Sequence, residues 1–272
     1  MRRIGSTPFA FPDFHGATRR LVLANLAAYF VLALALMAFP AVAGPLAVEL
    51  AFNPAAFLHG GFWQPLTYSF VHLSLLGALF ELLSLWFLAG FLESFHRDNW
   101  VMGLYAVSVL GTALAAVLLY FGGSLAGLDV APTLLTGCFG GIFGLLVAIG
   151  VLYGDVEFLL FFTIGIKARY MAVIFGLIAI AMLFGEQQLY AFAQLGGALA
   201  GYVFIRMAPR RGVSFAFSEK WYGLRNQYYR WKRRRAARKF EVYMRSQGRT
   251  VRFDGNGKQI HDDDPNDKTR WN

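Results

Sequence analysis

The chain has 272 residues, 57% of them hydrophobic and 17% aromatic, and its mean hydropathy is +0.49. This composition is too apolar for an ordinary soluble domain and predicts an all-α, polytopic membrane protein. The formal net charge of +9 is placed unevenly, because the stretch from Arg206 to Arg245 contains 13 Lys or Arg and only two acidic residues. A single cysteine, Cys138, excludes an intrachain disulfide and a cysteine-rich metal site. We predict no metal site and no cofactor.

Six apolar runs approach the length of about 20 residues that a helix needs to cross a bilayer. They cover residues 21–42, 66–90, 101–122, 134–153, 167–184 and 188–207. The apolar stretch just before the fifth run, residues 158–166, is predicted to lie at the membrane interface. Together the runs predict a six-helix membrane domain over residues 21–207, preceded by an N-terminal tail over residues 1–20.

Positive charges occur only in alternate connections between these runs. They precede the first run, separate the second from the third, begin the fifth and follow the sixth: Arg2, Arg3, Arg19, Arg20, Arg97, Lys167, Arg169 and the basic C-terminal segment. Residues 43–65, 123–133 and 185–187 contain no Lys or Arg. Because cytoplasmic loops carry the excess of Lys and Arg, both termini are predicted to be cytoplasmic. We expect the bacterial inner (plasma) membrane as the location.

The segment over residues 208–247 interleaves aromatic rings with basic side chains. This pattern predicts a helix at the cytoplasmic leaflet, where cations meet anionic headgroups. The expected headgroup contacts are Arg230, Lys232, Arg233, Arg234, Arg235, Arg238 and Lys239. Nucleic-acid binding is the alternative, and we favour membrane lipids because the segment directly follows a spanning run. Residues 248–272 lack apolar periodicity and are predicted to be disordered.

The fourth run, residues 134–153, contains five glycines. Helices in lipid associate through close packing, so small residues at helical spacing indicate a contact face. The expected helix-packing glycines come from the fourth and sixth runs: Gly137, Gly140, Gly141, Gly144, Gly197 and Gly201.

Several short motifs are arranged as in one known family. A Trp63-Gln64-x-x-Thr67 sequence leads to His72, Leu92-Glu93 ends the second run, the fourth run is rich in glycine, and residues 194–201 read QLGGALAG. Over roughly residues 20–207 the chain thereby resembles the rhomboid family. Rhomboids are intramembrane serine proteases that cut transmembrane substrates, so the resemblance implies a six-helix rhomboid-like bundle.

The resemblance also implies that both catalytic residues have been lost. The family's Gly-x-Ser-Gly motif stands here as Gly137-Cys138-Phe139-Gly140, and the histidine before Leu-Gly-Gly stands as Gln194. Phenylalanine has no nucleophilic atom, and a glutamine amide cannot act as the base that activates a nucleophile. Phe139 and Gln194 are therefore degenerate nucleophile and base positions.

The positions implied for oxyanion stabilisation are also changed, to Gly77 and Glu81. A carboxylate would repel an oxyanion, whereas one good donor contributes about 3 kcal/mol; a protonated Glu81 could still donate one hydrogen bond. An acid inside a spanning helix is costly and usually has a partner or a role. Gln194 is one expected partner, and a backbone carbonyl or a nearby hydroxyl is the other. A polar cavity formed by His72, Glu81, Cys138 and Gln194 is the resulting hypothesis.

An unorthodox Cys138/His72 catalytic pair is a further alternative, since a nucleophile and a base at hydrogen-bond distance would suffice. We favour Cys138 as a small packing residue and His72 as a hydrogen-bonded structural residue. The favoured function is a rhomboid-like pseudoprotease that binds transmembrane helices of client proteins without cleaving them. The alternatives are an active intramembrane endopeptidase and, suggested only by Glu81, a transporter or channel component, which would be expected to show an inverted repeat.

Overall fold

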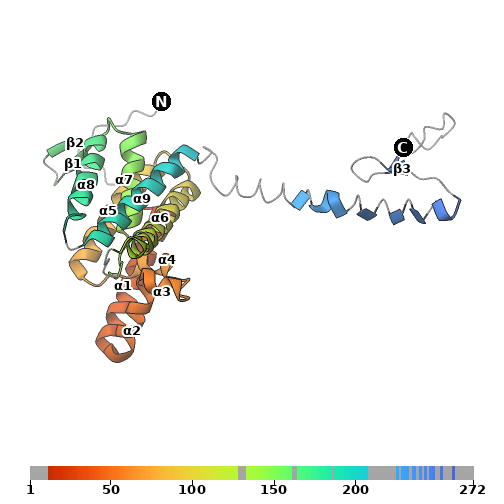
Figure 1. Cartoon of the computed structure of the whole chain (residues 1–272). Helices are drawn as coiled ribbons and strands as arrows, with labels where there is room; N and C mark the ends of the chain where they lie inside the picture. The colour runs from red at the N-terminus through yellow and green to blue at the C-terminus, as the bar shows by residue number, and fades with distance from the viewer. Residues whose placement is uncertain are drawn as a thin grey trace. The chain divides into compact units, whose positions relative to one another are not determined.

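The computed structural model describes residues 12–127, 133–160, 164–185 and 187–207, together with short pieces from residue 225 onward. The chain forms two compact units, Met1–Val213 and Ser214–Asn272, which are described separately. The first unit is mostly helical (Figure 1).

Six helices of the first unit follow the six predicted runs in order. They are α1 Gly16–Ala38, α5 Leu75–Glu93, α6 Asp98–Leu125, α7 Phe139–Leu152, α8 Ala168–Met182 and α9 Gln188–Met207. Among the described residues, α1, α5, α6 and α9 are long and apolar enough to cross a membrane. The helices α7 and α8 are also apolar, but they have only 14 and 15 residues. The chain is thus a mostly helical, polytopic membrane protein.

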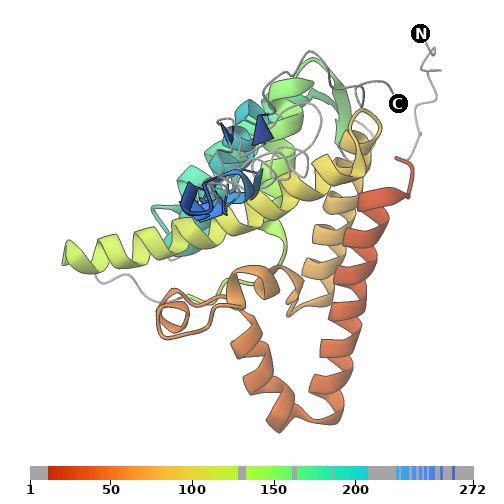
Figure 2. The same ribbon diagram turned by 90° about the vertical axis from the view of Figure 1, so that its right-hand side faces the viewer.

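Short helices fill the connection between α1 and α5. They are α2 Pro40–Leu50, α3 Pro54–Leu58, α4 Gln64–Thr67 and the 3₁₀-helix η1 Tyr68–Phe70. Figure 2 shows α1 and α2 as the two arms of a narrow V. The first predicted run ends four residues early, at Ala38, because the backbone leaves the helical conformation at Phe39 and Pro40 then starts α2.

The second and fourth predicted runs begin too early. The long helix α5 starts at Leu75, where the Ser74 hydroxyl accepts a hydrogen bond from the Gly77 N–H at 3.1 Å and caps the helix. Helix α7 starts at Phe139, because Gly137 has a φ of +84°, a backbone conformation outside the helix. The residues just before α7 pair with an earlier loop through the bridge between Phe52 and Leu135.

A β-hairpin lies where an interfacial segment was predicted. Its strands, β1 Glu157–Leu160 and β2 Ile164–Lys167, are antiparallel, with Glu157 opposite Lys167. The expectation of a purely α-helical membrane domain is therefore wrong at this connection. The five consecutive apolar residues 158–162 do not alternate with polar ones, so periodicity alone could not distinguish a strand from a buried helix.

The second unit contains helical turns among the described residues 225–246, within the predicted basic helix. Where a disordered tail was predicted, β3 Arg252–Phe253 pairs antiparallel with β4 Gln259–Ile260. The other residues of that predicted tail beyond residue 248 lie outside the described part of the chain, as do residues 1–11 and 208–224.

The helices α6, α7 and α9 pack most extensively and form the centre of the first unit (Figure 1). Glycines allow their backbones to approach. A Cβ added to Gly201 would lie 2.7 Å from the Gly144 Cα, and one added to Gly197 would lie 2.7 Å from the Gly140 carbonyl oxygen. Neither position has room for a side chain, so these glycines set the separation between α7 and α9.

Candidate functional site

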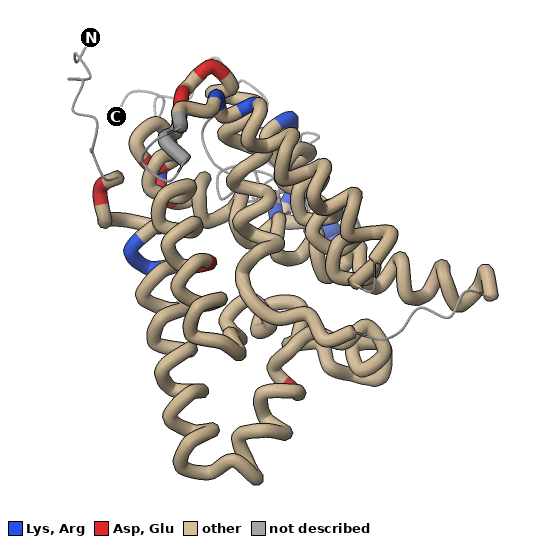
Figure 3. Tube along the Cα trace, turned by 90° about the vertical axis from the view of Figure 1, so that its left-hand side faces the viewer, with Lys and Arg blue, Asp and Glu red and all other residues tan. Residues whose placement is uncertain are grey.

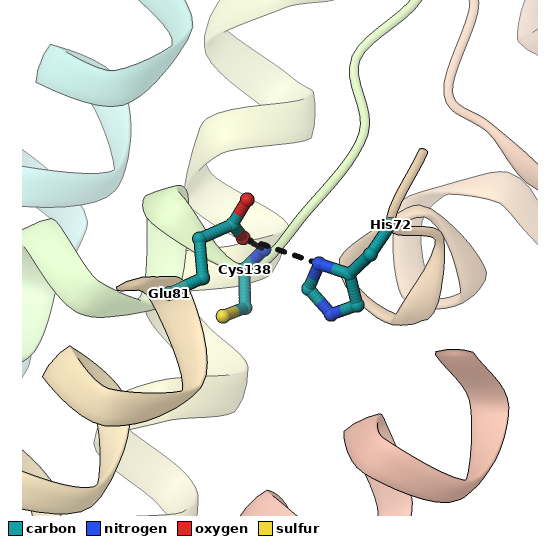
Figure 4. Close-up of side chains that lie close together, drawn as sticks. All are labelled: His72, Glu81 and Cys138. Atoms are coloured by element: carbon teal, nitrogen blue, oxygen red, sulfur yellow. Dashed lines mark hydrogen bonds and ion pairs between the residues drawn. The ribbon is translucent and has the colours of Figure 1, made fainter. Parts of the chain in front are cut away.

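A buried polar cluster lies where α5 meets the start of α7. The Glu81 side chain comes from the second turn of α5, and one carboxylate oxygen, Oε2, accepts the backbone N–H of Cys138 at 2.5 Å. The same oxygen lies 3.5 Å from His72 Nδ1. Figure 4 shows Glu81, His72 and Cys138 converging from three separate segments. All three residues are buried, with 4 to 7% of His72 and Glu81 exposed and none of Cys138.

Gly137 makes this convergence possible. A Cβ at this position would overlap the Glu81 carboxylate, and the positive φ is itself unfavourable for other residues. The Gly137 N–H lies 2.8 Å from the Val71 carbonyl oxygen and 3.1 Å from that of Tyr68. These bonds pin the approach to α7 against the η1 segment, and so they aim the Cys138 N–H at Glu81.

His72 is also held from its other side. Its Nε2 lies 3.2 Å from Asn25 Oδ1, and Asn25 Nδ2 donates to the Leu21 carbonyl at 2.8 Å within α1. Asn25 is fully buried. Asn25 was not predicted as a site residue, although a polar residue inside the apolar run 21–42 is the same kind of signal that marked Glu81.

The donor atoms of His72, Glu81 and Cys138 all lie within 4.8 Å of one another. This juxtaposition was not predicted as a possible metal site, because His72 and Cys138 lie 66 positions apart and no ligand spacing in the sequence connects them. The cluster unites three of the four residues of the hypothesised polar cavity. The fourth, Gln194, lies on the wall of a neighbouring cavity.

That cavity brings together the two degenerate catalytic positions. Phe139 and Gln194 both line it, and the cavity is small, with a volume of about 10 Å³. The other walls include Gly140 and three residues that were not predicted as site residues, Tyr68, Thr112 and Tyr190. The Phe139 ring meets the Tyr190 ring edge-on, with centroids 6.5 Å apart. Phe139 thus presents hydrocarbon to this space, and Gln194 presents a neutral amide.

The remaining predicted site residues have other surroundings. Gly77 lies in the first turn of α5 and donates its N–H to Ser74, outside the His72/Glu81/Cys138 cluster. Gly140 and Gly144 face Thr112 and Ser108 of α6, and Gly141 faces the Tyr105 ring. Of the predicted headgroup contacts, Arg230, Lys232, Arg235 and Lys239 lie in described helical turns and are exposed, whereas Arg233, Arg234 and Arg238 fall outside the described residues.

The charges of the first unit are segregated. Figure 3 shows its Lys and Arg residues away from the end that contains α2. Between Arg20 and Arg97, and again between Arg97 and Lys167, the sequence has no Lys or Arg. Near the positive end, Arg20 pairs with Asp98 at 3.0 Å and Arg169 pairs with Asp155 at 2.8 Å. This segregation is the pattern on which the predicted orientation depends.

Comparison with known proteins gives a family for this chain. The model of a family described as eukaryotic integral membrane protein, DUF1751, matches residues 20–213. The chain belongs to this family. The match begins within α1 and extends past the end of α9, and it agrees with the four long apolar helices among the described residues. No curated protein matches the chain.

The DUF1751 assignment corrects the expected location. The family is described as eukaryotic, so a bacterial inner membrane is not supported. The family description and the four long apolar helices among the described residues both identify the chain as an integral membrane protein.

Proposed function

We propose that this DUF1751 protein is a rhomboid-like pseudoprotease that binds transmembrane helices of client proteins without cleaving them. The observation that carries the proposal is the cavity shared by Phe139 and Gln194. In the rhomboid resemblance these residues occupy the nucleophile and base positions. A phenyl ring and a neutral amide can shape a binding site, but they cannot form and break an acyl bond.

The contact made by Glu81 also argues against proteolysis. A backbone N–H that stabilises an oxyanion must be free to donate to substrate in the transition state. Here the Cys138 N–H already donates to the Glu81 carboxylate. An internal acceptor, the Glu81 oxygen, therefore already occupies a donor next to the degenerate nucleophile position.

The packing of α5 and α8 offers a path for a client helix. Both helices pack on α7, but they make little contact with each other. Ala168 and Ala179 of α8 are buried, Met171 and Ala172 are half-buried against the core, and most of its other apolar side chains are exposed. A client helix could enter from the lipid between α5 and α8 and reach α7 without passing through water. Membrane lipids and single-span proteins are the proposed partners, with the basic segment over 208–247 at the cytoplasmic leaflet.

Site-specific photocrosslinking in native membranes tests this proposal. A photoreactive residue replaces Phe80 of α5 or Leu177 of α8, which are 60% and 59% exposed. The matched control is Leu34 of α1, which is 63% exposed and lies on another helix. We expect adducts from Phe80 and Leu177 that mass spectrometry maps to the transmembrane segments of single-span proteins. Equal yields of such adducts from Leu34, or none from either test position, would contradict the proposal.

A proteolysis assay separates this proposal from the alternative of an active endopeptidase. The full chain is reconstituted with a generic transmembrane substrate and treated with a serine-directed fluorophosphonate probe. We expect no labelling and no cleavage. Cleavage that is lost on Cys138→Ser or His72→Gln would instead support the unorthodox Cys138/His72 enzyme.

A further inference from the structure

We propose that His72, Glu81 and Cys138 bind one divalent transition-metal ion, with Zn²⁺ the best match to their donor atoms. The proposal does not depend on client binding. It starts from geometry: an imidazole nitrogen, a carboxylate oxygen and a thiol sulfur lie within 4.8 Å of one another in a buried setting (Figure 4).

The hydrogen bonds around His72 leave one ring nitrogen with an unused lone pair. Asn25 donates its amide N–H to the Leu21 carbonyl, so the Asn25 oxygen faces His72 and accepts from Nε2–H. In a neutral imidazole, Nδ1 is then an acceptor. It has no hydrogen-bond partner, although only 1% of the His72 side chain is exposed.

A second acceptor atom, Glu81 Oε2, lies near this lone pair. Glu81 Oε2 lies 3.5 Å from His72 Nδ1 and already accepts the Cys138 N–H. Two acceptors that face each other away from water repel unless a positive charge lies between them. Either a shared proton or a metal ion can provide that charge, and the Cys138 sulfur beside them favours the metal.

The donor set and its charge both suit a divalent ion. Zn²⁺ takes imidazole, carboxylate and thiolate ligands, and softer donors select it over Mg²⁺ or Ca²⁺. On binding, the Cys138 S–H bond is replaced by a sulfur–metal bond and the proton passes to solvent. A neutral imidazole, one carboxylate and one thiolate then balance a divalent ion, so no net charge is buried in the membrane.

The distances require only a small adjustment. Ligand atoms around tetrahedral Zn²⁺ lie about 3.5 Å apart, which is the present separation of His72 Nδ1 and Glu81 Oε2. The sulfur would have to close by up to about 1 Å. Two outer contacts already hold the ligands: Asn25 fixes the His72 ring, and the Cys138 N–H orients the carboxylate. A water or the second Glu81 oxygen could complete the coordination.

Cobalt substitution tests the proposal on the full chain in detergent micelles. The protein is stripped with a chelator and titrated with Co²⁺, whose thiolate complexes have a charge-transfer absorption band. Because Cys138 is the single cysteine, such a band can come from no other residue. We expect the band to saturate at one equivalent and to disappear when Zn²⁺ is added. Absence of the band would overturn the proposal and would leave a shared proton between His72 and Glu81.

Matched variants separate this cluster from other metal-binding groups. Cys138→Ser should abolish the band, and Glu81→Gln should weaken Co²⁺ binding at least 10-fold, whereas the control His96→Gln should leave both unchanged. A second control combines His261→Ala with Asp262→Asn, Asp263→Asn and Asp264→Asn; it removes a histidine-acidic run near the C-terminus and should also leave both unchanged. Unchanged binding in Glu81→Gln would contradict the proposal. If that variant does not fold, X-ray absorption of the Co²⁺-loaded wild-type protein decides, since the site requires one sulfur ligand and a coordination shell without sulfur would refute it.

Discussion

Glu81 shows how a carboxylate can be accommodated inside a membrane protein by backbone groups. Its oxygen takes the N–H of Cys138, and Gly137 has no side chain to obstruct the approach. The sequence identified Glu81 as conspicuous, because acids are costly in spanning helices. It did not reveal the partner: the expected Gln194 lies on the cavity with Phe139, whereas the carboxyl group of Glu81 contacts Cys138 and His72. Such contacts depend on how a loop turns, which residue identity alone does not specify.

Substitution of Gly137 is expected to disrupt this arrangement. In Gly137→Ala the new methyl group would overlap the Glu81 carboxylate, and the residue would be strained at a φ of +84°. We expect a loss of about 2 kcal/mol or more in the free energy of unfolding, measured by denaturant titration in mixed micelles. The control is Gly176→Ala in α8, where no atom lies within 4 Å of the added Cβ. That change should leave stability the same or raise it by up to about 1 kcal/mol.

His96 is expected to make stability depend on pH. It lies between α5 and α6, its ring stacks on Trp100 with centroids 3.9 Å apart, and burial lowers its pKa from the ordinary value of 6.5. In the pH range below 6.5 the unfolded chain therefore binds more protons than the folded chain, so stability falls as the pH falls through this range. The measurement is the unfolding midpoint between pH 8 and 5. His96→Gln should flatten that slope, and an identical slope in the variant would assign the pH dependence to other groups.

At the scale of elements, the positions of helices were predictable and their ends were not. All six apolar runs contain a helix, because length and composition determine which segments can lie in lipid. The ends depend on single residues, such as the Ser74 cap and the positive φ at Gly137. The hairpin of β1 and β2 was missed because its apolar residues continue directly toward α8.

The start of α1 provides an element-scale prediction. Its N-cap residue, His15, makes no side-chain cap; instead Glu93 of α5 accepts the N–H groups of Ala17 and Thr18 at 2.7 and 3.1 Å. A carboxylate there satisfies free N–H groups and lies at the positive end of the helix dipole. Glu93→Ala should therefore cost about 1–2 kcal/mol of unfolding free energy. Glu49→Ala, at an exposed acid in α2, is the control and should change it little; equal losses in the two variants would refute the capping role.

At the scale of the whole molecule, the segregation of positive charge predicts orientation. A flexible linker with an Asn-x-Thr glycosylation acceptor, inserted after Gly127, should be modified in microsomes, because that connection is predicted to face away from the cytoplasm. The same linker inserted after Gly248 should stay unmodified. A glycosidase-sensitive mass shift reports the result. The reverse pattern would show that the charge rule fails for this chain.

The exposure of most apolar side chains of α8 has a mechanical consequence. Lipid chains are as apolar as the side chains of α8, so moving this helix away from α7 loses close packing but exposes nothing that lipid cannot cover equally well. Separating α7 from α9 is different, because the glycine contacts there let backbone meet backbone, and no lipid chain can fill such a narrow gap equally well. We therefore expect the centre formed by α6, α7 and α9 to be rigid and α8 to be more mobile. Thermal motion of the first unit should be concentrated in α8.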